Sequence, residues 1–255
     1  MTASAQHLAE RALARRAAAG APLRLWLRDD DAVAPTPALD RLLGFAAEAR
    51  IPLTLAVIPA PWDQPPTGPA LARRLEAEPD ATVVLHGWSH RNHAPSGVKK
   101  QELGPHRPLC TIRAELRAGL ERLRQWHGAR ALPMLVPPWN RIAPELLPFL
   151  AEDGFTALST FGPEKPTEGL RVLNTHLDMI DWHGSRSLRP RDTLWMELAA
   201  LADSGQDTAG VLTHHLAHDA EIWSFLTELA GTVAAGHGEW CALRALIPAA
   251  PAQSA

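Results

Sequence analysis

The chain has 255 residues, of which 46% are hydrophobic, and its formal net charge is -3 at pH 7. This length suits one large domain with a substantial core, and the lack of a lysine- or arginine-rich block gives no case for a nucleic-acid partner. No stretch is long and apolar enough to span a membrane, and the two distant cysteines, Cys110 and Cys241, favour neither a disulfide framework nor a thiolate zinc site.

The first 22 residues are rich in Ala, Leu and Arg and predict a short amphipathic helix that ends near Gly20 and Pro22. They lack the apolar centre of a secretory signal, so we expect a cytoplasmic protein. An organellar transit peptide is the alternative, although Glu10 and the shortage of serine count against it. We interpret the chain as an N-terminal helical extension (1–22), a single domain (23–248) and a C-terminal tail (249–255).

Strands and helices alternate along the domain. The strands are predicted over residues 23–28, 52–59, 82–85, 132–136, 156–160, 170–174 and 209–213, and the helices over 35–50, 71–78, 109–127, 144–153, 191–204 and 220–235. The long loop over residues 86–108 is rich in His, Gly and Pro, and loops of that length are usually functional or disordered. This order predicts an α/β fold with a parallel sheet of about seven strands. A barrel or distorted barrel is favoured over an open doubly wound sheet.

Polar side chains follow three of the predicted strands. Three aspartates (residues 29–31) follow the first strand, His86 follows the third, and His214 and His215 follow the last. In parallel α/β folds the carboxyl ends of the strands share one rim, where binding sites are built. We therefore expect these residues to converge on one site. An acidic loop or a helix N-cap is the alternative for the aspartates.

His86 and His90 have a spacing that lets two imidazoles reach one metal ion. Together with one carboxylate they would form an open site with room for water and substrate. His93 is interpreted as a supporting residue of the loop. Of His214 and His215 only one can point inward, because side chains alternate along a strand, and that histidine could protonate a leaving group. The alternative is that the pair caps the final helix.

Five motifs, taken in order from about residue 23 to 220, resemble those of the polysaccharide deacetylase family, also called the NodB-homology family. They are the aspartates within Arg28 to Asp31, His86-Gly87-Trp88-Ser89-His90, a partial match in Val136-Pro137-Pro138-Trp139-Asn140, Asp178-Met179-Ile180-Asp181-Trp182, and Val211-Leu212-Thr213-His214. The chain departs from the family at Val136 and Asn140, which replace Arg and Gly, and at Gly87, which replaces Ser or Thr.

The resemblance implies a distorted (β/α) barrel of the NodB-homology type and a metal-dependent hydrolase that acts on carbon–nitrogen bonds. Such an enzyme removes an acyl group from an N-acylated substrate, for which an N-acetyl sugar is the first candidate, by attack of a metal-bound water on the amide carbonyl. The implied ligands of one divalent ion are Asp31, His86 and His90. This donor set suits zinc as the first choice, with manganese, cobalt, nickel and iron as alternatives.

The family pattern further implies that Asp30 is the general base and His214 the general acid, oriented by Asp178 or Asp181. The three aspartates leave a second register open, in which the functional pair is Asp29 and Asp30.

The base loses its usual arginine partner in this chain because Val136 stands in the third motif. We predict that Arg28 replaces this partner, since residues two apart in a strand face the same side. Arg141, which follows the third motif in sequence, is the rival donor.

The substrate is expected to be a saccharide or another small molecule, with no nucleic-acid or membrane partner, and the oligomeric state stays open. Trp88, Trp139 and Trp182 are predicted to line its groove, and the alternative is that they pack loops. Hydrolysis of a non-sugar amide with the same metal ligands and a catalytically inactive, glycan-binding relative are the competing functions.

Overall fold

The computed structural model describes residues 3–247, so the predicted tail (249–255) lies outside the described residues. This part of the chain forms one sheet of nine parallel strands in the order β6-β5-β4-β3-β2-β1-β8-β7, with the short β9 also paired to β1. The strands are β1 (Arg24–Ala32), β2 (Leu53–Val57), β3 (Ala81–Leu85), β4 (Ala131–Leu135), β5 (Ala157–Leu158), β6 (Arg171–Val172), β7 (Thr175–Asp178), β8 (Thr208–Thr213) and β9 (Glu239–Trp240).

The sheet curls until its two ends meet. Thr175 in β7 donates its N–H to the carbonyl of Thr160, and its own carbonyl accepts from the N–H of Gly162, at 3.0 and 2.8 Å. Both partners lie in the segment after β5, so strand pairing continues around the sheet. The predicted distorted (β/α) barrel is therefore confirmed, with β7 and β9 as short strands that the sequence pattern did not predict.

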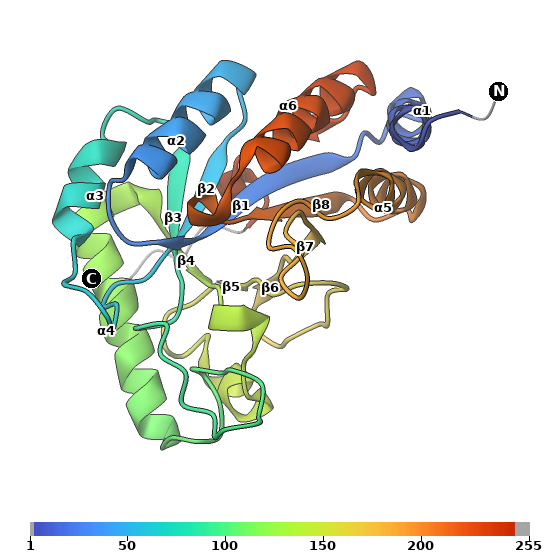
Figure 1. The fold of residues 1–255 in the computed structure, drawn as a ribbon. Coiled ribbons are helices and arrows are strands. Elements are labelled where there is room, and N and C mark those ends of the chain that lie inside the picture. The colour runs from blue at the N-terminus through green and yellow to red at the C-terminus, as the bar shows by residue number, and fades with distance from the viewer. Residues whose placement is uncertain (1–2, 248–255) are drawn as a thin grey trace.

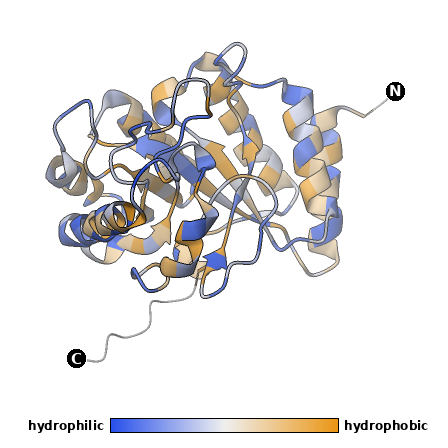
Figure 2. Cartoon of the chain, turned by 90° about the horizontal axis from the view of Figure 1, so that it is seen from below, coloured by the Kyte–Doolittle hydropathy of each residue, from blue (hydrophilic) through white to orange (hydrophobic). Residues whose placement is uncertain are grey.

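Helices pack around the outside of the curled sheet (Figure 1). In Figure 2 they carry hydrophilic residues beside hydrophobic ones, as expected for helices with one side in the core and one in water. The helices are α1 (Ala5–Ala18), α2 (Pro37–Ala49), α3 (Gly68–Leu75), α4 (Leu109–His127), α5 (Arg191–Asp203) and α6 (Ala220–Ala235). No helix in residues 3–247 is long and apolar enough to cross a membrane.

The helix predicted for residues 144–153 is wrong in length and type. Only Pro144–Phe149 is helical, as a 3-10 turn, and it contains Pro148. Proline lacks the N–H that an α-helical hydrogen bond needs and its ring clashes with the preceding turn, so an α-helix does not continue here.

The predicted N-terminal extension packs into the same hydrophobic core as the barrel. Leu13 in α1 is fully buried, and Gln6 donates to the hydroxyl of Thr232 in α6 at 2.9 Å. Arg15 forms an ion pair with Asp203 at the end of α5. The helix therefore forms part of the wall that α5 and α6 build on this side of the sheet.

Inside the barrel, a second apolar cluster includes Trp26 and Val136, and Leu243 and Ile247 near the end of the described chain pack into it. Side chains alternate along a strand, so Arg28 and Asp30 in β1 face the same interior as Trp26. The polar pair lies toward the carboxyl end of the strand, which is the rim expected to carry the site.

Candidate active site

Strand β1 continues through all three aspartates and does not end at Arg28 as the sequence pattern predicted. Its register with β2 shifts between Asp29 and Ala32, and Asp31 has a φ of 69°. A bulge of this kind adds a residue to one strand and re-aims a side chain, and aspartate tolerates a positive φ better than most residues. As a result the side chains of Asp30 and Asp31 both lie at the rim, although the two residues are adjacent in the strand.

The three predicted ligands converge at this rim. The Asp31 Oδ1 atom lies 3.2 Å from His86 Nε2 and 3.3 Å from His90 Nε2, and all three ligand atoms lie within 4.8 Å of one another. Two ligands of a tetrahedral zinc ion are about 3.4 Å apart, as follows from bond lengths near 2.1 Å. Asp31 Oδ1 is buried and accepts no hydrogen bond from residues 3–247. The donor set and its spacing therefore fit one divalent cation.

The surroundings prepare the two imidazoles to bind a cation. His86 Nδ1 lies 2.9 Å from the carbonyl oxygen of Val136 and donates to it, which leaves the lone pair of Nε2 directed at the site. Burial and the neighbouring His86 lower the pKa of His90 to about 4, so its ring is neutral at pH 7. Burial would raise the pKa of Asp31, but the two neighbouring imidazoles, that of His86 first and that of His90 second, hold it well below its usual range.

Asp30 is held by Arg28 inside the barrel. Arg28 Nε lies 2.8 Å from Asp30 Oδ1 and Nη2 lies 3.0 Å from Oδ2, with both side chains almost fully buried. The same guanidinium donates to Asn140 Oδ1 at 2.9 Å and to Ser159 Oγ at 2.7 Å. Arg141, the rival donor, instead donates to the carbonyl of Lys100. The contacts thus place Arg28 beside the predicted base.

Asp29 forms a buried pair with His215, which the sequence did not predict. Its carboxylate accepts from the backbone N–H of His215 at 2.7 Å and lies 2.5 Å from His215 Nδ1, and both side chains are buried. Burial opposes protonation of His215, but the hydrogen bond and charge of Asp29 raise its pKa. This pair anchors the chain after β8 to β1 and leaves Asp30 and Asp31 as the aspartates free to face the rim.

His214 packs edge-on against Trp182, with ring centroids 4.6 Å apart. Trp182 Nε1 in turn donates to Asp178 Oδ2 at 3.0 Å, and Asp178 lies near enough to His214 for their charges to interact. Burial raises the pKa of Asp178, although its hydrogen bonds and the charge of His214 oppose this. His214 Nδ1 is buried and finds no hydrogen-bond partner among residues 3–247.

The contacts of Asp181 do not support the prediction that it orients His214. Its two carboxylate oxygens accept from the backbone N–H groups of Gly184 and Ser185, each at 3.1 Å. Asp181 therefore caps a surface turn, and Asp178 is the carboxylate that the fold brings to His214.

Two of the three predicted groove tryptophans flank the site. The Trp139 ring centroid lies 4.3 Å from that of His90, and Trp182 covers His214. Trp88 instead stacks against Arg122 in α4, 4.5 Å from its ring centroid, so it packs the loop as the alternative interpretation held.

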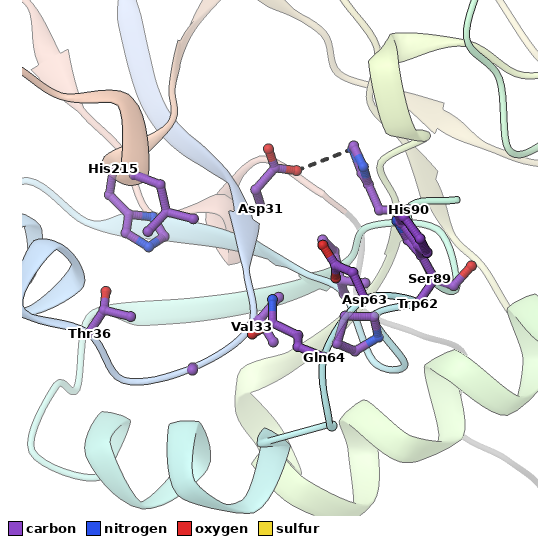
Figure 3. A pocket seen from close by; sticks show the side chains of 13 residues that line it. Asp31, Val33, Thr36, Trp62, Asp63, Gln64, Ser89, His90 and His215 are labelled. Atoms are coloured by element: carbon purple, nitrogen blue, oxygen red, sulfur yellow. Dashed lines mark ion pairs between the residues drawn. The ribbon is translucent and has the colours of Figure 1, made fainter. Parts of the chain in front are cut away.

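A cavity of about 300 Å³ opens beside Asp31 and His90 (Figure 3). In Figure 3 these two side chains point toward one another, and His215 lies on the other side of Asp31. Trp62 and Leu216 are exposed by 63% and 61%, and both line the cavity. The full lining is Asp31, Val33, Ala34, Thr36, Ile58, Pro61, Trp62, Asp63, Gln64, Ser89, His90, His215 and Leu216, with no Lys or Arg among these residues. The cavity therefore suits an uncharged organic group.

Trp62 was missed by reasoning from the sequence, although a signal was present. It follows the predicted strand over residues 52–59 and so belongs to the same rim as the metal ligands.

Comparison by sequence found no matching family model and no matching curated protein. Comparison by structure found a putative polysaccharide deacetylase from Mycobacterium smegmatis, 19% identical, with a TM-score of 0.62 and a match over 88% of each chain. The chitin deacetylase from Colletotrichum lindemuthianum is 18% identical, with a TM-score of 0.57 over 90% of this chain and 89% of that one. A family 4 acetyl xylan esterase from Clostridium thermocellum, solved in complex with a cobalt ion, is 16% identical, with a TM-score of 0.53 over 88% of this chain and 89% of that one. At such low identity these matches show a shared fold.

Proposed function

We propose that this chain, whose fold is that of the polysaccharide deacetylases, is a metal-dependent hydrolase of that family that removes an acyl group from nitrogen. The observation that carries the proposal is the convergence of Asp31, His86 and His90, whose ligand atoms lie within 4.8 Å of one another at the carboxyl ends of the strands. The ligand set suits zinc, and the cobalt ion in the Clostridium thermocellum structure is consistent with a divalent metal in this fold.

A divalent cation held by these ligands lowers the pKa of water to roughly 7 and polarises an acyl oxygen. We assign the role of base to the carboxylate of Asp30, which Arg28 holds by one hydrogen bond and one further ion-pair contact, and which would take a proton from the attacking water. His214, whose ring packs against Trp182, would give a proton to the departing nitrogen. This division assigns the base to strand β1 and the acid to the residue that directly follows strand β8.

For the substrate we propose an acylated saccharide or another neutral small molecule. The similar structures include enzymes named for chitin and acetyl xylan, which supports a saccharide. The exposed ring of Trp62, with Asp63 and Gln64 beside it, offers a flat apolar face and hydrogen-bonding groups of the kind that sugar rings use. The apolar side of the same cavity, which includes Leu216, favours a non-sugar amide as the second candidate.

Metal analysis of the purified protein tests the proposal directly. We expect one zinc ion per wild-type chain after reconstitution and less than about a tenth of that in His86→Ala, because two ligands hold a catalytic cation far more weakly than three. Acetate release from N-acetylated chitooligosaccharides should disappear with the metal. His7→Ala, which changes an exposed histidine on α1, is the control. Undiminished zinc in His86→Ala would rule out this ligand set.

The role of His214 predicts a difference between leaving groups. His214→Ala should slow hydrolysis of an N-acetyl amide by roughly 10²-fold or more, because an amine leaves only when it is protonated. Hydrolysis of p-nitrophenyl acetate should change much less, since a nitrophenolate leaves without a proton. Equal losses on both substrates would contradict the role of His214 as the acid.

A further inference from the structure

A fully buried carboxylate, Glu102, lies next to the candidate metal site without any part in the proposed reaction. It belongs to the long loop between β3 and α4, and its neighbours fix the backbone there. The carbonyl of Leu103 accepts from the N–H of Ala143 at 2.7 Å, and the carbonyl of Gln101 accepts from the N–H of His93 at 3.0 Å. Glu102 therefore projects from a segment that is anchored on both sides.

Among residues 3–247, all the hydrogen bonds of the Glu102 side chain come from the turn that joins His86 to His90. Oε2 accepts from the N–H of Trp88 at 3.2 Å, and Oε1 accepts from the N–H and the hydroxyl of Ser89 at 2.7 and 2.9 Å. Within residues 3–247, no basic side chain forms an ion pair with it. A buried carboxylate needs such donors, so the carboxylate and the turn stabilise each other.

The backbone of this turn is in a conformation that is unfavourable without support from other residues. Gly87 and His90 have φ values of 61° and 56°, in the left-handed region that a histidine adopts at a cost. A Cβ atom on Gly87 would lie 2.1 Å from Glu102 Oε2 and 2.6 Å from Pro138 Cγ. Glu102 thus fills the space that the Ser or Thr of the family motif would need, which accounts for the glycine in this chain.

We propose that Glu102 is a positioning residue that holds the His86–His90 turn in its metal-binding shape before a metal arrives. The proposal rests on the proposed function for the importance of that shape. Partners that orient metal ligands typically contribute 10- to 100-fold to metal affinity. Glu102 forms no hydrogen bond with the imidazoles themselves but accepts hydrogen bonds from the backbone and hydroxyl groups of Trp88 and Ser89, which lie between the two histidines.

The test is Glu102→Gln, measured without substrate. The carboxamide keeps the volume of the side chain but has one acceptor, and its NH₂ group would face an N–H donor of the turn. We expect the amide hydrogens of Trp88 and Ser89 to exchange about tenfold faster in the metal-free variant, and zinc binding by titration calorimetry to weaken about tenfold or more. Glu78→Gln, which removes the negative charge of an ion pair with Arg74 in another part of the chain, should leave both measurements unchanged.

A second variant covers the case in which Glu102→Gln does not fold. Ser89→Ala removes only the hydroxyl donor, and it should weaken zinc binding by about threefold while the fold, checked by circular dichroism, is kept. Wild-type zinc affinity in folded Glu102→Gln or, failing that, in Ser89→Ala would overturn the proposal. Wild-type protein that binds no zinc would instead refute the proposed function, and the exchange of Trp88 and Ser89 would then decide alone whether Glu102 holds the turn.

Discussion

Asp30→Asn should keep the metal and lose turnover by 10²-fold or more, the loss typical of a removed general base. Asparagine has the shape of aspartate and keeps one oxygen for the guanidinium of Arg28, so the barrel interior should stay intact. It cannot accept the proton of the attacking water. The measurements are zinc per chain and kcat on an N-acetylated substrate.

Asp31→Asn is the matched comparison for this prediction. It changes the neighbouring aspartate in the same way, but Asp31 meets both imidazoles, so this variant should lose the metal together with the activity. The reverse pattern, with zinc lost in Asp30→Asn and kept in Asp31→Asn, would contradict the assignment. The functional pair would then be Asp29 and Asp30.

Arg28→Met should lower kcat by about 10²-fold while the zinc content stays nearly unchanged. The variant leaves the buried carboxylate of Asp30 without its cation, and breaking a buried ion pair from one side typically costs 3–5 kcal/mol. Such a carboxylate binds its proton more readily, so the acid limb of the pH–rate profile should move to higher pH. Unfolding by urea and a pH–rate profile would measure the two effects.

Arg141→Met is the control for Arg28→Met, because Arg141 makes its hydrogen bond to the carbonyl of Lys100. It should change neither kcat nor the pH profile. If Arg28→Met were silent and Arg141→Met moved the acid limb, the arginine of the third motif would have shifted only a few residues along the loop. The role given to Arg28 would then be wrong.

Local patterns in the sequence were sufficient for the fold class and for most elements. Helix α6 (Ala220–Ala235) and helix α4 (Leu109–His127) have the predicted bounds, because their apolar residues recur with the helical period over several turns. The convergence of Asp31, His86 and His90 was also predictable, since the carboxyl ends of parallel strands meet at one rim whatever the details of the fold. Strands as short as β6 and β9 carry too few residues for a period to be read with any precision.

Only the tertiary structure decided which contacts each residue of the site makes. Asp29 forms hydrogen bonds with His215, which lies 186 positions away. The bulge at Asp31 directs two adjacent carboxylates to one rim. The role of Glu102 could not be predicted from the sequence because two of its three hydrogen-bond donors are backbone N–H groups, which nearly every residue carries, and the third is the hydroxyl of a serine 13 positions away. The sequence by itself determined which chemical groups gather at the rim, since this follows from strand order. Which group each one touches depends on contacts between distant segments, and no local period encodes them.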